Sequence, residues 1–459
     1  MRDRGERAVR EKTVRDTTMR DTGVRVPGDK SLAHRALLVA SLARTASLIR
    51  GLPDGDDVAH TVACLRALGA RIDVDERETR VQPSPWTQPL AALSCGNSGT
   101  LARLLMGAIA GARETLDVTL TGDASLSSRP MARVVGPLRA LALGGGFALT
   151  ASGTLPARIR SSVADDSDSV TAATDATDVV VVTGAASTQV KSAVILASRN
   201  LHGRVVVREP LATRDHTERM LRALLCTVHS EANVVTLACP LAWDGFTIDL
   251  AGDPSSAALL AAYAVLARRV LVVDDLLWNP FRTGFFTALQ RMGAFVEASG
   301  ERLVLGEPVV RVVVRAAAAP LRGVEVAAHE VPGLVDEVPA LAVVAACAHG
   351  TTRIRGVHEL RLKESDRLAR VVDLVVAFGG EAHAVGDDLV IEGRALAPPA
   401  RVAVRTDGDH RIAMAAHVLA RAHGVTAVLD VPGCERTSYP GFVDALDALD
   451  ALDDTTGTP

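Results

Sequence analysis

Apolar positions in this chain follow one pattern that recurs roughly every 70 to 85 residues. In each copy, apolar residues three or four apart predict an amphipathic helix, small residues predict a turn, and alternating residues predict a strand. Glycine ends the helical part of most copies, which is typical of a helix C-terminus, but the copy around Cys226 has a weaker signal. The copies are residues 62–75, 138–151, 221–235, 289–299 and 371–385.

Short Gly-Asp turns between these copies predict further helix starts. They occupy residues 28–31, 122–125, 252–258 and 408–411. With a helical stretch at residues 442–454, the pattern amounts to about six copies of one α/β unit. Six units predict two domains of three units each, with the junction near residues 243–247. Residues 161–178 are rich in Ser, Asp and Thr and are predicted to be an inserted surface loop.

Composition agrees with this organisation and narrows the function. The 459 residues are 48% hydrophobic with a mean hydropathy of +0.21, so two sizeable cores can form. No apolar run reaches the roughly 18–20 residues of a membrane helix. A net charge of −4 gives no basic field, so we expect neither nucleic-acid nor membrane binding. Six scattered cysteines without a CxxC pair argue against disulfides and zinc, and fit a reducing cytoplasm.

The N-terminal residues 1–21 mix charges of both signs with few apolar residues. They lack the apolar stretch that a secretory signal needs. We therefore expect a disordered, solvated extension.

Lysine is almost absent from the chain, because only four of the 50 basic residues are lysine. Lys12 lies in the N-terminal extension, which leaves Lys30, Lys191 and Lys363. A lysine ammonium is a compact point charge whose pKa responds to burial, and arginine does not replace it. These three lysines are therefore candidates for binding or catalysis.

The stretch VPGDKSLAHRALL, residues 26–38, predicts a turn that leads into a helix. The N-terminus of a helix can bind anions through its free backbone N–H groups. Lys30 and His34 share one helical face, and Ser31 and Arg35 share another. These residues alone leave two interpretations open, an anion site or a solvated and capped first turn.

Other predicted helix starts also carry cations, hydroxyls or glycine. Each by itself can be an ordinary helix cap, but together they predict a ligand with more than one anionic group. The residues are Gly99, Thr100 and Arg103 in CGNSGTLARLL, Arg129 in SLSSRPMARV, Ser187, Thr188, Gln189 and Lys191 in GAASTQVKSAVILAS, and Arg411 in GDHRIAM.

The densest cluster of charge is HELRLKESDRLARV, residues 358–371. If this stretch is helical, Lys363 and Arg367 share a face and Glu364 lies beside them. It predicts either a proton-transferring carboxylate among cations or a surface helix with ion pairs.

Asp336 and Glu337 interrupt an otherwise apolar segment. Burial would raise the pKa of one of these acids and make it a base, or the pair would cap the following helix. The chain has no His, Cys and Asp spacing typical of a metal site, so we predict no metal. It also has no dinucleotide or P-loop glycine motif.

A set of motifs occurs in order over residues 24–447: VPGDKSLAHRALL, GNSGT, LTGDASLSSRPM, GAASTQVKSA, TRDHTERML, GDPSSAA, RTGFFTALQRMGA, LVDEVPALAV, ELRLKESDRL, GDHRIAM and TSYPGF. Together they resemble the 5-enolpyruvylshikimate-3-phosphate synthase family of enolpyruvyl transferases. The resemblance implies an α/β, two-domain enolpyruvyl transferase fold, an inside-out α/β barrel with three βαβαββ units per domain. It implies one domain at residues 29–244 and another at 22–28 plus 245–452, with the active site in the cleft between them.

The resemblance also implies the reaction. The family transfers the carboxyvinyl group of phosphoenolpyruvate to the 5-hydroxyl of shikimate 3-phosphate and releases phosphate. The reaction passes through a tetrahedral intermediate, needs no cofactor, and belongs to the shikimate pathway to chorismate and the aromatic amino acids. The resemblance further implies a cytoplasmic, monomeric enzyme. Gly99 and Thr100 match the form of the family that leaves room for the inhibitor glyphosate.

Matched to the family motifs, the site residues fall into three groups. The catalytic residues would be Asp336, which accepts the proton of the attacking hydroxyl, Glu364, which donates a proton to the vinyl methylene, and Lys30. Shikimate 3-phosphate would bind Lys30, Ser31, Arg35, Ser187, Thr188, Arg214, Asp336 and Lys363. Phosphoenolpyruvate would bind Lys30, Gly99, Arg129, Gln189, Arg367 and Arg411.

The chain departs from the family pattern at a few positions. Thr188 stands where Ser or Ala is usual, Ala33 replaces a frequent Ser, and Thr437 occupies a position where some members have a Lys. The alternatives are transfer to another acceptor, either UDP-N-acetylglucosamine or a specialised metabolite, and a non-catalytic phosphate-binding paralogue. The UDP-N-acetylglucosamine enzymes carry Lys-Asn where this chain has Lys30 and Ser31.

Overall fold

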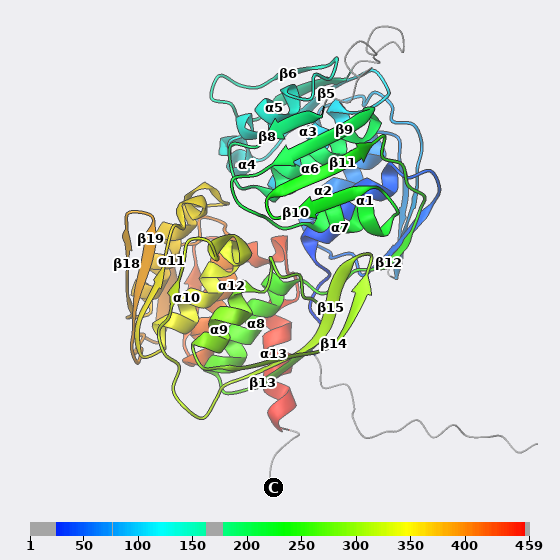
Figure 1. The fold of residues 1–459 in the computed structure, drawn as a ribbon. Coiled ribbons are helices and arrows are strands. Elements are labelled where there is room, and N and C mark those ends of the chain that lie inside the picture. The colour runs from blue at the N-terminus through cyan, green and yellow to red at the C-terminus, as the bar shows by residue number, and fades with distance from the viewer. Residues whose placement is uncertain (1–23, 76, 162–177, 455–459) are drawn as a thin grey trace, which may run out of the picture.

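The structure is a computed structural model that describes residues 24–75, 77–161 and 178–454. The chain forms two lobes, each with its own hydrophobic core (Figure 1). Most of the first core comes from residues 32–251, and the second comes from Val24 and residues 257–449. The predicted extension 1–21 and most of the predicted loop 161–178 lie outside the described residues. Within the described part, no helix is long and apolar enough to cross a membrane.

The first lobe contains the elements up to β12. Its helices are α1 (Lys30–Ser41), α2 (Asp56–Ala67), α3 (Gly99–Ala110), α4 (Ala124–Ser128), α5 (Ala132–Arg139), α6 (Thr188–Ala197) and α7 (His216–Ala223). Its strands are β1 (Ser47–Arg50), β2 (Arg71–Val74), β3 (Glu78–Gln82), β4 (Leu93–Ser94), β5 (Leu116–Thr121), β6 (Gly146–Ala148), β7 (Ala157–Ser161), β8 (Val179–Val182), β9 (Gly203–Arg208), β10 (Val228–Glu231), β11 (Val234–Cys239) and β12 (Thr247–Asp249).

The second lobe contains the remaining elements. Its helices are α8 (Pro254–Leu266), α9 (Gly284–Arg291), α10 (Val338–Ala346), α11 (Arg367–Ala377), α12 (His410–Ala422) and α13 (Phe442–Asp454). Its strands are β13 (Val270–Leu277), β14 (Phe295–Val304), β15 (Glu307–Arg315), β16 (Glu325–Val326), β17 (Gly350–Ile354), β18 (Glu381–Val385), β19 (Asp388–Gly393), β20 (Arg401–Val404) and β21 (Thr426–Leu429).

The strands of the described residues form six sheets, and four of these sheets repeat one arrangement. The sheets β12-β1-β3-β2, β4-β5-β7-β6, β8-β9-β11-β10 and β16-β17-β19-β18 each begin with a parallel pair and continue with antiparallel pairs. The order β4-α3-β5-α4-α5-β6-β7 is a βαβαββ unit, and β8 to β11 and β16 to β19 repeat it. The repeat predicted from the apolar pattern is therefore confirmed.

The turn inside each repeat needs a left-handed backbone. Gly69 and Gly293 supply it with φ of +104° and +103°. In the copy with the weak signal, Leu225 takes the left-handed conformation, with φ of +65°, just before Cys226. The fold therefore imposes the turn even where no glycine marks it.

Some helices are apolar on nearly every side, and for this reason they lie inside the lobes against the sheets (Figure 1). Every residue of α10 is buried, and so is α8 from Pro254 to Val265. Helices α3 and α6 pack so closely that a Cβ on Gly107 would lie 2.1 Å from the backbone oxygen of Ala193. Helices inside and sheets outside confirm the predicted inside-out α/β barrel.

Two short segments cross between the lobes side by side. Asp29 N donates to Ala251 O at 2.7 Å and Asp253 N donates to Pro27 O at 2.9 Å, so the segments pair as antiparallel strands. Strand β12 still pairs with β1, and Ile248 and Leu250 pack in the first core. The second crossing therefore lies after Ala251, beyond the boundary predicted at residue 244.

Candidate active site

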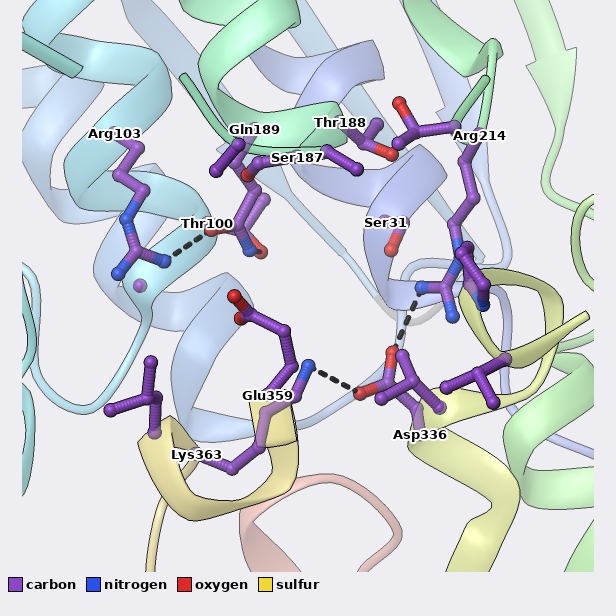
Figure 2. A pocket seen from close by; sticks show the side chains of 18 of the residues that line it. Ser31, Thr100, Arg103, Ser187, Thr188, Gln189, Arg214, Asp336, Glu359 and Lys363 are labelled. Atoms are coloured by element: carbon purple, nitrogen blue, oxygen red, sulfur yellow. Dashed lines mark hydrogen bonds and ion pairs between the residues drawn. The ribbon is translucent and has the colours of Figure 1, made fainter. Parts of the chain in front are cut away.

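A cavity of about 480 Å³ lies between the lobes and is lined by both of them (Figure 2). The first lobe contributes the starts of α1, α3 and α6, and the second contributes the segments before α10 and α11 and the start of α12. The predicted site residues that line it are Lys30, Ser31, Arg35, Gly99, Arg129, Ser187, Thr188, Gln189, Arg214, Asp336, Lys363, Glu364 and Arg411. Arg367, predicted to bind phosphoenolpyruvate, does not line it, and neither does the candidate lysine Lys191.

Helix α1 begins at the cavity because Asp29 caps it. The Asp29 carboxylate accepts a hydrogen bond from Leu32 N at 2.7 Å, which leaves Lys30 and Ser31 in the first turn, facing the cavity. Lys30 Nζ lies 2.7 Å from Oδ2 of Asp57. Arg35 is buried and donates to Thr217 Oγ1 at 2.9 Å, so part of its guanidinium is held from behind.

His34, the remaining polar residue of the predicted helix start at residues 26–38, has a structural role. Its ring lies 2.7 Å from Thr61 Oγ1 through Nδ1 and 3.2 Å from Ser98 Oγ through Nε2. Burial lowers the pKa of His34 to about 4, so the ring is neutral at physiological pH. Neutral His34 joins α1 to α2 and to the start of α3, and it does not line the cavity.

The Gly-Asn-Ser-Gly-Thr turn brings cations to the start of α3. A Cβ on Gly99 would lie 3.0 Å from Nη1 of Arg103 and 3.4 Å from Nη1 of Arg129. Glycine therefore allows both guanidinium groups to approach the backbone. Gln189, from α6, donates through Nε2 to Thr100 Oγ1 at 2.8 Å and accepts a hydrogen bond from Arg103.

Helix α6 presents its N-terminus to the same cavity. Ser187 occupies the cap position, but its side chain makes no capping hydrogen bond. The Ser187 and Thr188 hydroxyls and the free N–H groups of the first turn are therefore available to an anion (Figure 2).

Asp336 lies in the middle of a cluster of cations (Figure 2). Its carboxylate is 2.9 Å from Arg214 Nη1, 3.1 Å from Lys363 Nζ and 3.7 Å from Arg367 Nη1. Burial alone would raise the pKa of Asp336, but Lys363, Arg214 and the other cations outweigh it and hold the pKa well below 3.8. The expectation that burial raises the pKa of this acid is therefore wrong for the ligand-free protein.

The stretch 358–371 is not one helix. Residues His358–Leu362 form a 3-10 turn, and α11 begins only at Arg367, after Asp366 caps it by accepting from Ala369 N at 3.1 Å. Lys363 is extended, so it does not share a helical face with Arg367. The break between the two helical segments leaves Lys363 and Glu364 free to face the cavity.

Glu364 lies between cations from both lobes. It accepts a hydrogen bond from Arg367 Nη2, and Arg129 Nη1 lies 3.8 Å from its carboxylate. Burial would raise the pKa of Glu364, but Arg367 and Arg129 outweigh it and hold the pKa well below 4.5. Without a ligand this carboxylate is ionised.

Arg367 lies behind the cavity wall with no exposed surface. It also donates to Asp409 at 2.9 Å, so its position is fixed by two carboxylates. Nη1 has no hydrogen-bond partner among the described residues. The prediction that Arg367 contacts phosphoenolpyruvate stays a prediction, and Nη1 is the atom with capacity for it.

Several cavity residues were missed by sequence reasoning or given no role by it. They are Asp57, Arg103, Arg133, Asp253, Arg282 and Glu359. Arg103 follows Gly99 by four residues on α3, a spacing that signals a shared face. Asp57 and Arg282 give no such signal, because their partners Lys30 and Asp29 lie 27 and 253 residues away.

Ion pairs join the lobes across the cavity. Besides Arg214–Asp336 and Arg129–Glu364, Arg133 Nη1 lies 3.4 Å from Glu359. Ser125 Oγ also donates to the backbone oxygen of Glu364 at 3.0 Å. These contacts hold the two lobes together around the cavity. Its lining has more Lys and Arg residues than Asp and Glu residues, which favours an anionic ligand.

Comparisons with known proteins agree with this geometry. A family model described as EPSP synthase (3-phosphoshikimate 1-carboxyvinyltransferase) matches residues 15–446. This chain belongs to the EPSP synthase family. The 3-phosphoshikimate 1-carboxyvinyltransferase of Gluconobacter oxydans is 40% identical over 430 residues, which cover 92% of this chain and 93% of that protein. The protein of the same name from Granulibacter bethesdensis is 41% identical over 439 residues, covering 92% and 91%.

Solved structures with the same fold include one member of the family. The EPSP synthase of Acinetobacter baumannii superposes with a TM-score of 0.76 at 32% identity, covering 93% of this chain and 96% of that one. The enolpyruvyl transferase NikO of Streptomyces tendae superposes with a TM-score of 0.69 at 18% identity, covering 93% and 94%. The second likeness concerns the fold alone.

Proposed function

We propose that this chain transfers the carboxyvinyl group of phosphoenolpyruvate to the 5-hydroxyl of shikimate 3-phosphate and releases phosphate. Membership of the EPSP synthase family supports this reaction. The observation that carries it is one cavity between the lobes in which two carboxylates, Asp336 and Glu364, lie among cations from both lobes. Each substrate carries a phosphate and a carboxylate, and such a cavity suits two polyanions.

Shikimate 3-phosphate would bind against α1, α6 and the segment before α7. Ser187 and Thr188 at the start of α6 would hold its phosphate, together with Arg214. Nη2 of Arg214 is buried and has no hydrogen-bond partner among the described residues, so it has capacity for a ligand. Ser31, Arg35 and Lys363 complete this half of the site.

Phosphoenolpyruvate would bind at the start of α3, close to the second lobe. Gly99 allows a close approach of the backbone, and Arg129 and Gln189 line the same wall. Arg411 reaches this region, where its Nη1 donates to Asp336 O at 3.0 Å. Lys30 lies between the two halves of the site, so it serves both substrates.

Two proton transfers follow from the positions of the carboxylates. Asp336 takes the proton of the 5-hydroxyl, whose oxygen attacks the substituted vinyl carbon of phosphoenolpyruvate. Glu364 gives a proton to the methylene carbon, which becomes a methyl group in the tetrahedral intermediate. Loss of a methyl proton and of phosphate then restores the double bond in the product.

The charges around Glu364 set its protonation. Arg367 and Arg129 keep it ionised in the free protein, which is the wrong state for a proton donor. Phosphoenolpyruvate brings negative charge to these same cations, and a negative charge next to a carboxylate raises its pKa. Glu364 therefore takes up a proton when phosphoenolpyruvate binds and becomes the acid that the first step needs.

We further propose that the enzyme acts as a monomer in the cytoplasm. Transfer to a different acceptor is the remaining alternative. Ser31 follows Lys30 where the UDP-N-acetylglucosamine enzymes have Asn, which favours shikimate 3-phosphate.

Phosphate release by the purified protein tests the reaction. Release that requires both phosphoenolpyruvate and shikimate 3-phosphate, with the carboxyvinyl ether identified by mass spectrometry, is the expected result. An Asp336→Asn variant, which keeps the size of the side chain but removes the base, is the control for contaminating phosphatase. Release with UDP-N-acetylglucosamine in place of shikimate 3-phosphate would overturn the acceptor.

A further inference from the structure

The third lysine of the folded chain lies outside the cavity that holds the other two. Lys191 is on α6, in the turn after Ser187 and Thr188, and is 3% exposed. It does not line the cavity. The reaction proposed above gives it no role, so its retention in a chain so poor in lysine needs another reason.

The Lys191 ammonium contacts three oxygens, one in a hydrogen bond and two in ion pairs. Its Nζ lies 2.7 Å from Glu209 Oε2 and 2.9 Å from Glu218 Oε1, and it donates to Thr213 O at 3.2 Å. Burial opposes the charge, but Glu218 and Glu209 outweigh it and raise the pKa of Lys191. The ammonium is therefore charged and paired with two carboxylates.

Two of these residues, Glu209 and Thr213, belong to the loop that carries Arg214, and Glu218 belongs to α7. The loop, residues 209–215, connects β9 to α7. Glu209 is its first residue and also accepts from Thr213 Oγ1 at 2.7 Å, so Lys191, Glu209 and Thr213 close a small network. Thr213 directly precedes Arg214, whose guanidinium reaches across the cavity to Asp336 at 2.9 Å.

The same buried cluster extends to Arg35. Arg35 donates to Thr217 Oγ1 at 2.9 Å and to Ser192 Oγ at 3.0 Å, and Ser192 is the residue after Lys191. Thr217 precedes Glu218, the second carboxylate on Lys191. Two cations and two carboxylates thus balance each other under the half of the cavity assigned to shikimate 3-phosphate.

We propose that Lys191 is a positioning residue for shikimate 3-phosphate, because it holds the loop 209–215 and α7 against α6 and thereby places Arg214 and Arg35. That the ligand is shikimate 3-phosphate rests on the proposed function, whereas the position of the loop follows from the contacts of Lys191.

The geometry also explains why this residue is lysine. A point charge with three rotatable donors reaches three acceptors that surround it, whereas a planar guanidinium spreads its donors over a wider fork. The site is closed on all sides, so the larger group has no room without moving the loop.

Lys191→Met, which keeps most of the unbranched side chain but removes the ammonium, is the test variant. Arg199→Met is the matched control, because Arg199 follows the same helix, is 6% exposed, and donates to Ala108 O at 2.9 Å away from the cavity. We expect Lys191→Met to raise the KM for shikimate 3-phosphate about tenfold or more, with kcat and the KM for phosphoenolpyruvate within about twofold. Arg199→Met should lower the melting temperature and leave all three constants unchanged.

A second readout needs no substrate. Trypsin cleavage after Arg214 in the folded protein, followed by mass spectrometry, should be at least about five times faster in Lys191→Met because the loop opens more often. An unchanged rate would overturn the inference whichever acceptor the enzyme uses. An unchanged KM in a wild type that converts shikimate 3-phosphate would overturn it as well, whereas an inactive wild type would overturn only the proposed function.

Lys191→Met leaves two buried carboxylates without a cation, and this variant can fail to fold. The variant Lys191→Met with Glu209→Gln and Glu218→Gln removes that charge but still lacks the ammonium. It should fold and show the same raised KM and faster cleavage. Wild-type values in the folded triple variant would show that Lys191 only neutralises charge, and would overturn the inference.

Discussion

Replacing Arg282 by Met should destabilise the protein strongly, because one guanidinium holds the starts of helices in both lobes. Arg282 is 2% exposed and donates to Asp29 Oδ2 at 2.8 Å and to Asp253 Oδ1 at 2.9 Å. Asp29 caps α1, which carries Lys30 into the cavity. Asp253 caps α8 by accepting from Ser255 N at 2.8 Å.

The size of the effect follows from burial and pairing. Removing one partner of a buried ion pair typically costs about 3–5 kcal/mol, because the other partner stays buried without its counter-charge. Here two carboxylates lose their cation, and Met replaces most of the lost volume, so little of the cost is a cavity. We expect Arg282→Met to lose about 3–5 kcal/mol at pH 7.5, a large part of the 5–15 kcal/mol typical of a folded domain.

The loss should depend on pH. Burial alone would raise the pKa of Asp29, but Arg282 outweighs it, and the folded pKa is about 2, below the ordinary value of 3.8. In the wild type, this carboxylate therefore stabilises the fold above pH 3.8 and loses that contribution as pH falls toward 2. In Arg282→Met, burial dominates and raises the folded pKa above 3.8. The variant regains stability as pH falls through that raised pKa, so its deficit is largest at neutral pH.

Equilibrium urea unfolding at pH 7.5 and 5.5, followed by circular dichroism, measures both effects. Arg311→Met is the control, because Arg311 lies 2.8 Å from Asp274 at the surface, with its side chain 44% exposed, and should change stability by less than about 1 kcal/mol. Arg282→Met combined with Asp253→Asn should recover part of the loss. A deficit below about 1 kcal/mol, or one that does not shrink at pH 5.5, would refute the reasoning.

Three predictions concern the cavity. The Glu364→Gln variant should still bind shikimate 3-phosphate, but its kcat should be lower by about 100-fold or more. It should also take up no proton when phosphoenolpyruvate binds, as measured by calorimetry in two buffers. Near-normal turnover would remove Glu364 from the mechanism. Lys30→Arg should be inactive in the phosphate-release assay, because its Nζ lies 2.7 Å from Asp57 and a planar fork does not fit that position, and an active variant would contradict this role. Glyphosate should inhibit the wild type, and wild-type activity that is indifferent to millimolar glyphosate would contradict this. The Gly99→Ala variant should be inhibited less, because the added Cβ would lie 3.0 Å from Arg103 Nη1.

Much of the fold could be read from the sequence because the signals are local. Apolar spacing and turn residues predicted the repeated α/β unit, and the structure has it in four sheets. Gly-Asp turns predicted helix starts, and α1, α4, α8 and α12 do begin next to them, each capped by the aspartate. All but one of the site residues matched to the ordered motifs line the cavity, because side chains at helix starts can face a common ligand.

The tertiary structure alone decided the electrostatics and the boundaries. The sequence suggested that burial would raise the pKa of Asp336 or Glu337. In the structure, four cations converge on Asp336 and lower its pKa: Lys363, Arg214, Arg411 and Arg367. Asp29 and Arg282 are 253 residues apart, and no local pattern pairs them. The sequence left open whether residues 358–371 form one helix, and the structure shows that the helical segments are separated at Lys363, which faces the cavity. Periodicity reports which face of an element is apolar, whereas the sign of a pKa shift depends on charges that only folding brings together.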